Sequence, residues 1–382
     1  MGKLAIITTH PIQYYAPVFK LLAQHINLKV FYTNGTESLE KFDEGFKRNI
    51  AWDLPLLEGY QYELLKNSSK KPGTHHFKGI SNPDALDRIT AFEPDAMLIY
   101  GWANQSHLAI IRYFYKKIPI YFRGDSTLLD QLPSVKSLLK KIFLIWVYKH
   151  IDIAFYVGSA NKEYYKYYGL KDEQLVFANH AIDNERFGEN KSVEADMLRN
   201  AIGVNQNEIL IVFAGKLETK KNPSILLKAF IELNLANAHL LFVGNGELED
   251  SLKFEVKNKS ILSVHFLDFQ NQTQIPTIYQ ASDLFCLPSQ GPGETWGLAV
   301  NEAMASGKAI LVSDKVGCGE DLITPETGMI FTSNDIDDLK QKLIALTQDK
   351  TTLMEMGKSA KKHIQNWSFD KQVRTIVDYV NR

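Results

Sequence analysis

One stretch of the sequence, from Leu287 to Gly307, concentrates residues whose types and spacing could bind an anion. Its pattern predicts a strand that ends at Leu287, a loop rich in glycine and proline, and a helix that begins near Gly297. Gly307 is a residue type that favours the position just after a helix. The first backbone N–H groups of a helix have no partner within it, and the helix dipole adds positive potential there. The stretch therefore predicts a diphosphate site formed by three backbone groups, those of Gly297, Leu298 and Ala299.

Two glutamates accompany this predicted anion site. Glu294 lies in the loop just before the helix, and Glu302 lies one to two turns inside it. Carboxylates accept hydrogen bonds from vicinal hydroxyls, and a nucleotide sugar carries hydroxyls on both its hexose and its ribose. The alternative interpretation is an acidic residue that favours the helix dipole, followed by a solvated helix glutamate.

A second stretch, from Phe213 to Pro223, places basic residues at the end of another predicted strand. The strand ends at Gly215, and a helix is expected to begin with Asn222 as its cap and Pro223 in its first turn. Lys216 and Lys221 would then lie at the rim, where a cation stabilises the charge that develops on a leaving diphosphate. The alternative is that they are solvated loop lysines, the common state of this residue.

Strand and helix patterns alternate along the chain and would position these loops. The predicted strands are Leu4–Thr8, Leu28–Tyr32, Ala96–Tyr100, Pro119–Phe122, Ile153–Val157, Ile209–Ala214, His239–Val243, Val264–Leu267, Leu284–Leu287 and Ala309–Val312. The predicted helices are Asn104–Lys117, Ser134–His150, Pro223–Leu233, Leu248–Val256, Thr273–Gln280 and Leu298–Ser306. Such alternation predicts parallel sheets that are covered by helices on both faces.

The pattern restarts near Ile209, and 382 residues suffice for two domains. We therefore expect an α/β protein with two doubly wound Rossmann-like domains that face each other across a cleft, because ligands bind beyond the carboxyl ends of such strands. The first domain is expected to span 1–183 and the second 184–366. Residues 36–81 lack clean periodicity and are interpreted as loops and short elements.

Composition and charge exclude several classes of protein. The formal net charge is −1, which argues against bulk electrostatic capture of nucleic acid. Two cysteines, Cys286 and Cys318, cannot form a disulfide framework and suggest a reducing compartment. Neither the N-terminal apolar run nor Ile142–Tyr148 is long enough for a signal peptide or a membrane span, so we expect a cytoplasmic protein.

The predicted helix at 134–150 mixes lysines with many apolar residues. A basic, apolar helix could rest on an anionic membrane surface, in weak peripheral contact with the inner face of the membrane. The apolar residues extend almost all round the second half of the helix, however, which favours a buried core helix with lysines at its edge.

Taken together, these stretches resemble the retaining family 4 glycosyltransferases of the GT-B fold. The resemblance covers most of the chain and is strongest from Gly158 to the end. Its motifs are the two glutamates Glu294 and Glu302; Gly215, Lys216, Leu217 and Lys221; Gly244-Asn245-Gly246; Phe266-Leu267-Asp268-Phe269; the hinge-like Asn179–Asp183 with Phe187; and Trp367-Ser368-Phe369. The last of these resembles the start of a C-terminal helix, here 367–382, that crosses back to the first domain.

The resemblance implies a role for each matched residue. Glu302 would hold the ribose, Glu294 the hydroxyls of the transferred sugar, and Lys216 with Lys221 the diphosphate. Further donor-binding residues would be Gly215, Gly244, Asn245, Phe269, Gln270, Gly297, Leu298 and Ala299. No metal or other cofactor is expected. The acidic run at 335–338 opens an apparent helix, where acidic residues are favoured in any case.

The sequence departs from the family pattern in three places. Lys216 stands where arginine is commoner, which leaves a point charge in place of a bidentate donor. Asp268 replaces a frequent glycine. The loop after the first strand lacks the usual paired glycines, and the usual first-domain histidine is missing, so the candidates on that side are His10, Gln13, Tyr14, Arg123 and Asp125. Which of Arg123 and Asp125 replaces the histidine stays open, and His10 has the alternative of a turn residue before proline.

The resulting hypothesis is a metal-independent hexosyltransferase of the kind used in polysaccharide biosynthesis. It would move a sugar from a UDP- or GDP-sugar to a saccharide, lipid-linked or small-molecule acceptor, with retention of configuration. Two alternatives are kept: a nucleotide-sugar 2-epimerase of the same fold, and a non-catalytic protein that binds sugar nucleotides. Fold alone does not decide among them.

Overall fold

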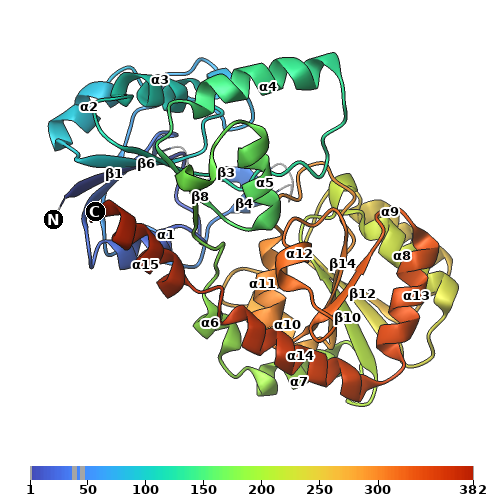
Figure 1. The fold of residues 1–382 in the computed structure, drawn as a ribbon. Coiled ribbons are helices and arrows are strands. Elements are labelled where there is room, and N and C mark those ends of the chain that lie inside the picture. The colour runs from blue at the N-terminus through green and yellow to red at the C-terminus, as the bar shows by residue number, and fades with distance from the viewer. Residues whose placement is uncertain (1, 37–40, 44–47, 382) are drawn as a thin grey trace. The chain divides into compact units, whose positions relative to one another are not determined.

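The chain forms two compact units in a computed structural model that describes residues 2–36, 41–43 and 48–381 (Figure 1). The first unit comprises Met1–Lys41, Leu54–His180 and Phe369–Arg382, and the second comprises Phe42–Asp53 and Ala181–Ser368. The second unit thus takes in Phe42–Asp53, a segment that a division at residue 183 assigns to the first domain. Each unit is described separately below.

The first unit is built on a seven-stranded parallel sheet with the order β5-β2-β1-β6-β7-β8-β9. Its strands are β1 (Lys3–Thr8), β2 (Asn27–Tyr32), β5 (Gln61–Leu64), β6 (Ala96–Tyr100), β7 (Ile120–Arg123), β8 (Ile153–Tyr156) and β9 (Leu175–Phe177). Its helices are α1 (Ala16–Leu22), α2 (Ala85–Phe92), α3 (Gln105–Phe114), α4 (Val135–Tyr148), α5 (Ser159–Tyr167) and α15 (Phe369–Val380).

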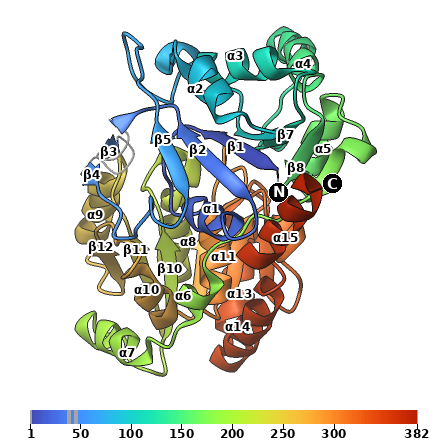
Figure 2. The same ribbon diagram turned by 90° about the vertical axis from the view of Figure 1, so that its left-hand side faces the viewer.

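Alternate residues of the central strand β1 contribute to two different cores. Ala5 and Ile7 belong to a cluster with residues of α2, α3, α4 and α5, whereas Leu4 and Ile6 belong to a cluster with residues of α1 and α15. This follows from the two-residue period of a strand, whose side chains point to opposite faces of the sheet. Figure 2 shows α15 beside α1, so the C-terminal helix packs on the first unit, as the sequence resemblance implied.

The second unit contains a six-stranded parallel sheet with the order β12-β11-β10-β13-β14-β15. Its strands are β10 (Ile209–Ala214), β11 (Ala238–Val243), β12 (Val264–Leu267), β13 (Leu284–Leu287), β14 (Ala309–Ser313) and β15 (Gly328–Phe331). Its helices are α6 (Asn184–Gly188), α7 (Ser192–Ala201), α8 (Pro223–Leu233), α9 (Glu249–Asn258), α10 (Ile275–Ala281), α11 (Leu298–Ala305), α12 (Gly319–Leu322), α13 (Ile336–Thr347) and α14 (Lys350–Ile364). A two-stranded sheet, β3 (Lys41–Asp43) with β4 (Arg48–Ile50), precedes residues 51–53.

The predicted parallel α/β architecture is confirmed, and the ten predicted strands all form within one or two residues of their expected ends. Sequence analysis missed β5, β9 and β15, and each of these lies at an edge of its sheet. An edge strand is only partly covered, so it does not need the continuous apolar run that marks a central parallel strand. The predicted cap at Asn222 is only half correct, because Pro223 opens α8 but the Asn222 side chain makes no capping hydrogen bond.

The prediction that 134–150 is a buried core helix is wrong. Only Leu144, Val147 and Tyr148 of α4 are buried. The exposed large apolar residues of this region are Leu132, Val135, Leu138, Leu139, Ile142, Phe143 and Ile145. Only the last turns of the helix contact the core. When apolar residues surround a helix, the sequence does not show which of them will be covered by other elements. Within the described residues, no helix is both long enough and apolar enough to cross a membrane.

Candidate active site

The strand order of the second unit reverses between β10 and β13. From β10 the chain proceeds outward through β11 and β12, and it then returns to add β13, β14 and β15 on the other side. In parallel sheets the loops that follow the two diverging strands separate at this point and leave room for a ligand. Here these loops are residues 215–222 and 288–297, the two stretches that the sequence singled out.

Gly297 caps α11, the helix that follows β13. It has φ +93°, in the left-handed region, and a Cβ atom at this position would lie 2.8 Å from Cγ1 of Val316. Both the backbone conformation and the close approach therefore require glycine. Val300 donates its backbone N–H to the Gly297 carbonyl at 2.8 Å, which starts the helix, so the preceding N–H groups lie at the helix start where an anion is stabilised.

Glu294 is only 8% exposed and lies between two donors. The Lys221 Nζ atom is 2.6 Å from Oε2 of Glu294, and the Ser289 hydroxyl donates to the same oxygen at 3.0 Å. Burial alone would raise the pKa of the carboxyl group, but the charge of Lys221 and both hydrogen bonds outweigh it and lower the pKa below its ordinary value. The structure thus brings together two predicted residues from loops on the two sides of the switch point.

This ion pair changes the charge that the site can offer to a diphosphate. Lys221 is compensated by Glu294, and the neighbouring Lys220 pairs with Glu218 at 3.4 Å. Gly215 lies against Lys221, since a Cβ atom there would be 3.3 Å from the Lys221 Cδ atom. The ion pair of Lys221 and Glu294 is therefore close to neutral, and the dipole of α11 gains importance for anion binding.

Glu302 is also buried, and its partner was not predicted from the sequence. The Tyr279 hydroxyl donates to Oε2 of Glu302 at 2.9 Å. Tyr279 lies on α10, and its ring packs against Phe187 and Phe285. No local motif marks this tyrosine, because its role follows from the packing of α10 against α11. The hydrogen bond from Tyr279 fixes the orientation of the Glu302 carboxylate.

The loops after β11 and β12 are joined by Asn245. Its side-chain oxygen accepts the backbone N–H of Phe269 at 2.9 Å, and its amide group donates to Asp268 at 3.1 Å. Gln270 donates its side-chain amide to the Asp268 carbonyl at 3.0 Å. Gly244 directly precedes Asn245 and is buried. The structure thereby brings together the four predicted donor residues of these two loops.

The loop that follows β10 is fixed to the loop that follows β13. Gln290 donates its backbone N–H to the Lys220 carbonyl at 2.8 Å and its side-chain amide to the Thr219 carbonyl at 2.7 Å. Gly317 donates to the Glu294 carbonyl at 3.0 Å, which supports the loop from the side of β14. These contacts therefore hold the lysine-bearing loop and the glutamate-bearing loop together.

The first-unit candidates lie on loops at the carboxyl edge of the other sheet. His10 and Tyr14 are half-buried and Gln13 is buried, all in the loop after β1. The Thr9 hydroxyl lies 2.9 Å from Nδ1 of His10. The three candidates therefore belong to one loop.

Arg123 has a structural environment that the sequence did not reveal. Its guanidinium group is almost fully buried and donates to the backbone carbonyls of Ala178 at 2.6 Å and Asn179 at 3.0 Å. It holds the segment at which the first unit ends, so it is poorly placed to replace a substrate-binding histidine. Asp125 lies two residues further along and is half-buried.

His180 is a further first-unit residue that the sequence analysis did not select as a site residue. It is buried, and its ring stacks on Tyr15 with 6.3 Å between the centroids. Burial, with a smaller contribution from the charge of Arg123, lowers its pKa well below the ordinary value, so the imidazole is neutral at physiological pH.

The residues that the structure describes include no group of three or more His, Cys, Asp or Glu side chains with the arrangement of a metal site. Asp335, the first residue of the acidic run, caps α13 by accepting the backbone N–H groups of Asp337 and Asp338. Both cysteines are buried free thiols.

Comparisons with known proteins find similarity to the second half of the sequence and to the fold. Residues 194–363 match the family described as glycosyl transferases group 1. The GDP-mannose-dependent monoacylated alpha-(1-6)-phosphatidylinositol monomannoside mannosyltransferase of Corynebacterium glutamicum is 27% identical over 258 residues, 63% of this chain and 64% of that protein. The UDP-Gal:alpha-D-GlcNAc-diphosphoundecaprenol alpha-1,3-galactosyltransferase of Escherichia coli is 31% identical over 202 residues, 52% of this chain and 51% of that protein. The matched regions thus span about half to two thirds of these relatives.

Solved structures extend the likeness to the whole chain at the level of the fold. The crystal structure of Anabaena Alr3699/HepE in complex with UDP and glucose has a TM-score of 0.74 at 17% identity, with all of both chains covered. A glycosyltransferase from Rickettsia africae has a TM-score of 0.75 at 14% identity and covers all of this chain and 98% of its own. The chain therefore has the two-domain GT-B fold, and its residues 194–363 match the glycosyl transferases group 1 family.

Proposed function

We propose that this protein is a glycosyltransferase that moves a hexose from a UDP- or GDP-sugar to a saccharide or lipid-linked acceptor, with retention of configuration and without a metal ion. The observation that carries the proposal is the pair of buried carboxylates, Glu294 and Glu302, on either side of the glycine-led start of α11. The names of the two relatives include GDP-mannose and UDP-galactose as donors, which supports a nucleotide diphosphate sugar here.

In this proposal each group acts where its chemistry fits. Glu302, supported by Tyr279, accepts hydrogen bonds from the ribose, and the start of α11 binds the diphosphate. Glu294 accepts from hydroxyls of the transferred sugar, and Lys216 and Lys221 stabilise the leaving diphosphate. The bond from the anomeric carbon to the diphosphate breaks, the acceptor oxygen bonds to that carbon on the same face, and the acceptor proton passes to a phosphate oxygen.

Calorimetric titration of two variants tests the site. Glu302→Gln removes the charged acceptor for the ribose, so UDP or GDP should bind about 10- to 100-fold more weakly, because a hydrogen bond to a charged group contributes ~1.5–3 kcal/mol. Glu294→Gln removes a negative charge beside the phosphates and leaves Lys221 uncompensated, so nucleotide binding should not weaken. Transfer from the full donor should slow by a similar factor if Glu294 binds the sugar more strongly in the transition state.

The matched control is Glu355→Gln on α14, where the glutamate is exposed and far along the chain from both carboxylates. It should change neither binding nor transfer. Unchanged nucleotide binding in Glu302→Gln would contradict the site assignment. Incubation with UDP-GlcNAc alone separates the transferase from an epimerase, because only an epimerase converts the donor without an acceptor.

We further propose that α4 rests on an anionic membrane surface on the cytoplasmic side, where it gives access to a lipid-linked acceptor. Val135, Leu139 and Ile142 are 77%, 62% and 60% exposed, although each is a large apolar residue. Lys136 and Lys140 on the same helix are exposed as well, and residues 131–151 contain no acidic residue. Exposed apolar side chains beside lysines match the boundary between acyl chains and anionic headgroups.

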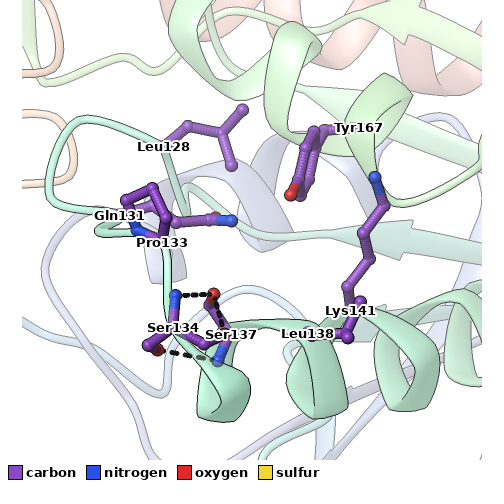
Figure 3. A pocket seen from close by; sticks show the side chains of 8 residues that line it. All are labelled: Leu128, Gln131, Pro133, Ser134, Ser137, Leu138, Lys141 and Tyr167. Atoms are coloured by element: carbon purple, nitrogen blue, oxygen red, sulfur yellow. Dashed lines mark hydrogen bonds between the residues drawn. The ribbon is translucent and has the colours of Figure 1, made fainter.

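A cavity of about 420 Å³ adjoins the start of this helix. Figure 3 shows Gln131 and Pro133 on one side of it and Lys141 with Tyr167 on the other. The Lys141 Nζ atom lies 3.8 Å from the centroid of the Tyr167 ring. The lining combines apolar carbon with one cation, a combination that suits part of an anionic lipid. Both relatives named above carry lipid-linked acceptors in their names, diphosphoundecaprenol in one and phosphatidylinositol in the other.

Co-sedimentation with vesicles tests this surface. Vesicles of phosphatidylcholine with phosphatidylglycerol should bind the protein, and pure phosphatidylcholine should bind it much more weakly, because each lysine near an anionic surface contributes ~1 kcal/mol. The double variant Leu139→Glu, Ile142→Glu should lose at least 10-fold in binding, since each side chain loses ~1.5–3 kcal/mol of apolar burial. Leu262→Glu is the matched control, because this leucine is 90% exposed in the second unit. Equal binding by the double variant and the control would refute the proposal.

A further inference from the structure

Residues 51–53, which follow β4, form a short segment with several contacts to the loop between β12 and α10. The Ala51 carbonyl accepts the side-chain amide of Asn271 at 2.8 Å. The Asp53 carboxylate accepts the backbone N–H groups of Gln272 and Thr273, each at 3.1 Å, and the Thr273 hydroxyl as well. These residues are about 220 positions apart in the sequence, and both segments belong to the second unit.

Asp53 holds the turn that leads into α10. The N-cap residue of this helix, Gln274, makes no capping hydrogen bond with its own side chain. The Asp53 carboxylate accepts the backbone donors that immediately precede it, and a carboxylate at this place is favoured by the helix dipole. Gln272 is also held from the other side, because Arg186 donates to its side-chain oxygen at 2.8 Å. The loop is therefore held by both Asp53 and Arg186.

Trp52 lies between these polar contacts and meets an aromatic residue of the same loop. Its ring is 6.2 Å from the ring of Phe269, with an interplanar angle of 66°, a geometry that aromatic pairs favour. Both side chains are only half-buried, so aromatic surface stays accessible. Phe269 itself is fixed through its backbone by Asn245.

The aromatic pair lies at the same carboxyl edge of the sheet as the lysine-bearing loop, because Asn245 accepts the Leu217 backbone N–H with its carbonyl at 3.0 Å and the Phe269 backbone N–H with its side chain. Glu302, where the ribose is proposed to bind, contacts Tyr279 of α10. The loop that leads into α10 is 268–274, which contains Phe269 and is held by Asp53. A purine or pyrimidine base stacks on aromatic side chains without regard to its identity.

We propose, on the basis of the proposed function, that Ala51–Asp53 is part of the donor site. Trp52 and Phe269 form an aromatic wall for the nucleotide base, and Asp53 is a positioning residue that holds the loop of Phe269 in place. A segment from the first half of the sequence thus contributes to recognition of the base, while the diphosphate is bound by residues of the second half alone.

Titration calorimetry with UDP, GDP and pyrophosphate separates the two contributions. Trp52→Ala should weaken UDP and GDP binding about 5- to 100-fold, the range of one base–aromatic stack, and leave pyrophosphate binding unchanged. Trp52→Phe keeps an aromatic surface and should restore most of the affinity. Asp53→Asn keeps the size of the side chain but loses its charge, so it should weaken nucleotide binding by a smaller factor and again spare pyrophosphate. Phe254→Ala, an aromatic residue 71% exposed on α9, is the matched control.

The outcomes are distinct. Equal losses for nucleotides and pyrophosphate in Trp52→Ala would show a merely structural role and overturn the proposal, as would unchanged nucleotide affinity. If the wild-type protein binds pyrophosphate but neither UDP nor GDP, the proposed donor and this inference fail together. As an independent readout, nucleotide should quench more tryptophan fluorescence in wild type than in Trp52→Phe, and equal quenching in the two proteins would contradict contact with the base.

Discussion

The pair of Lys221 and Glu294 gives the most direct test of the site, because it can be perturbed without any knowledge of the substrate. The side chains are 16% and 10% exposed, and their charged atoms are 2.6 Å apart. Removing one member of a buried ion pair costs ~3–5 kcal/mol, because the remaining charge is left uncompensated. Glutamine keeps the hydrogen-bonding capacity of Glu294, and Lys221 retains some access to water. We therefore expect Glu294→Gln to lower the free energy of unfolding by about 2–3 kcal/mol.

Urea denaturation followed by tryptophan fluorescence measures this loss. With a slope of about 2–3 kcal/mol per molar urea, the midpoint of the second unit should fall by about 1 M. Lys221→Met should cost a similar amount. The double variant leaves no unpaired charge, so its loss should be at least about 2 kcal/mol smaller than the sum of the two single losses. Losses that add within about 0.5 kcal/mol would show that the two groups do not interact as the structure indicates.

The pH dependence of the free energy of unfolding gives an independent test of the ion pair. The pKa of Glu294 is lowered in the folded protein from its ordinary value of 4.5, so the folded state binds this proton less readily than the unfolded chain. The stabilisation is then fully present above about pH 4.5 and is lost as the pH falls through the lower folded pKa. The difference in stability between wild type and Glu294→Gln should shrink over that acid range. A difference that grows toward low pH would refute the assignment.

Three further results are expected. Gly297→Ala should destabilise the second unit by about 1–3 kcal/mol and weaken pyrophosphate binding, because the backbone at this position is left-handed and an added Cβ atom would lie 2.8 Å from Val316. Urea denaturation and calorimetry measure the two effects, and wild-type stability and binding in the variant would contradict the requirement for glycine. Tyr279→Phe should weaken UDP or GDP binding about 3- to 10-fold, because Glu302 loses the hydrogen bond that orients it, whereas unchanged binding would separate the tyrosine from the ribose site. Sugar transfer should survive EDTA, since the proposed countercharge comes from lysines and the dipole of α11; loss of turnover that magnesium or manganese restores would refute this.

The parts of the fold that the sequence predicted well are those with strong local signals. The strands β10 and β13 are continuous apolar runs, and β11, β12 and β14 each contain a single polar residue. Gly297 follows a strand and precedes a helical pattern. Glu294 and Lys221 could be placed near each other because each follows a strand at the switch point of one sheet. Their direct ion pair could not be predicted, because the sequence does not set the distance between two loops.

Other features could not be read from local patterns because they depend on distant packing. The partners of Asp53 are 219 and 220 positions away, and Tyr279 meets Glu302 only because α10 packs on α11. Arg123 looked like a ligand group at the end of a strand, yet its guanidinium group donates to two backbone carbonyls. A charged side chain at a strand end has the same appearance in sequence whether it binds a ligand or the chain itself.

The error on α4 has a different origin and bears on the function. A helix that is apolar nearly all round is expected to be buried, since water would otherwise contact its hydrocarbon surface. In this protein the large apolar side chains in the first turns of α4 are exposed, while its lysines have no acidic neighbours on the helix. The same sequence feature fits two environments, a protein core or a membrane boundary, and the observed exposure rules out the core for the first turns of α4. An apolar helix that the fold leaves uncovered is consistent with an acceptor that is delivered from a lipid phase.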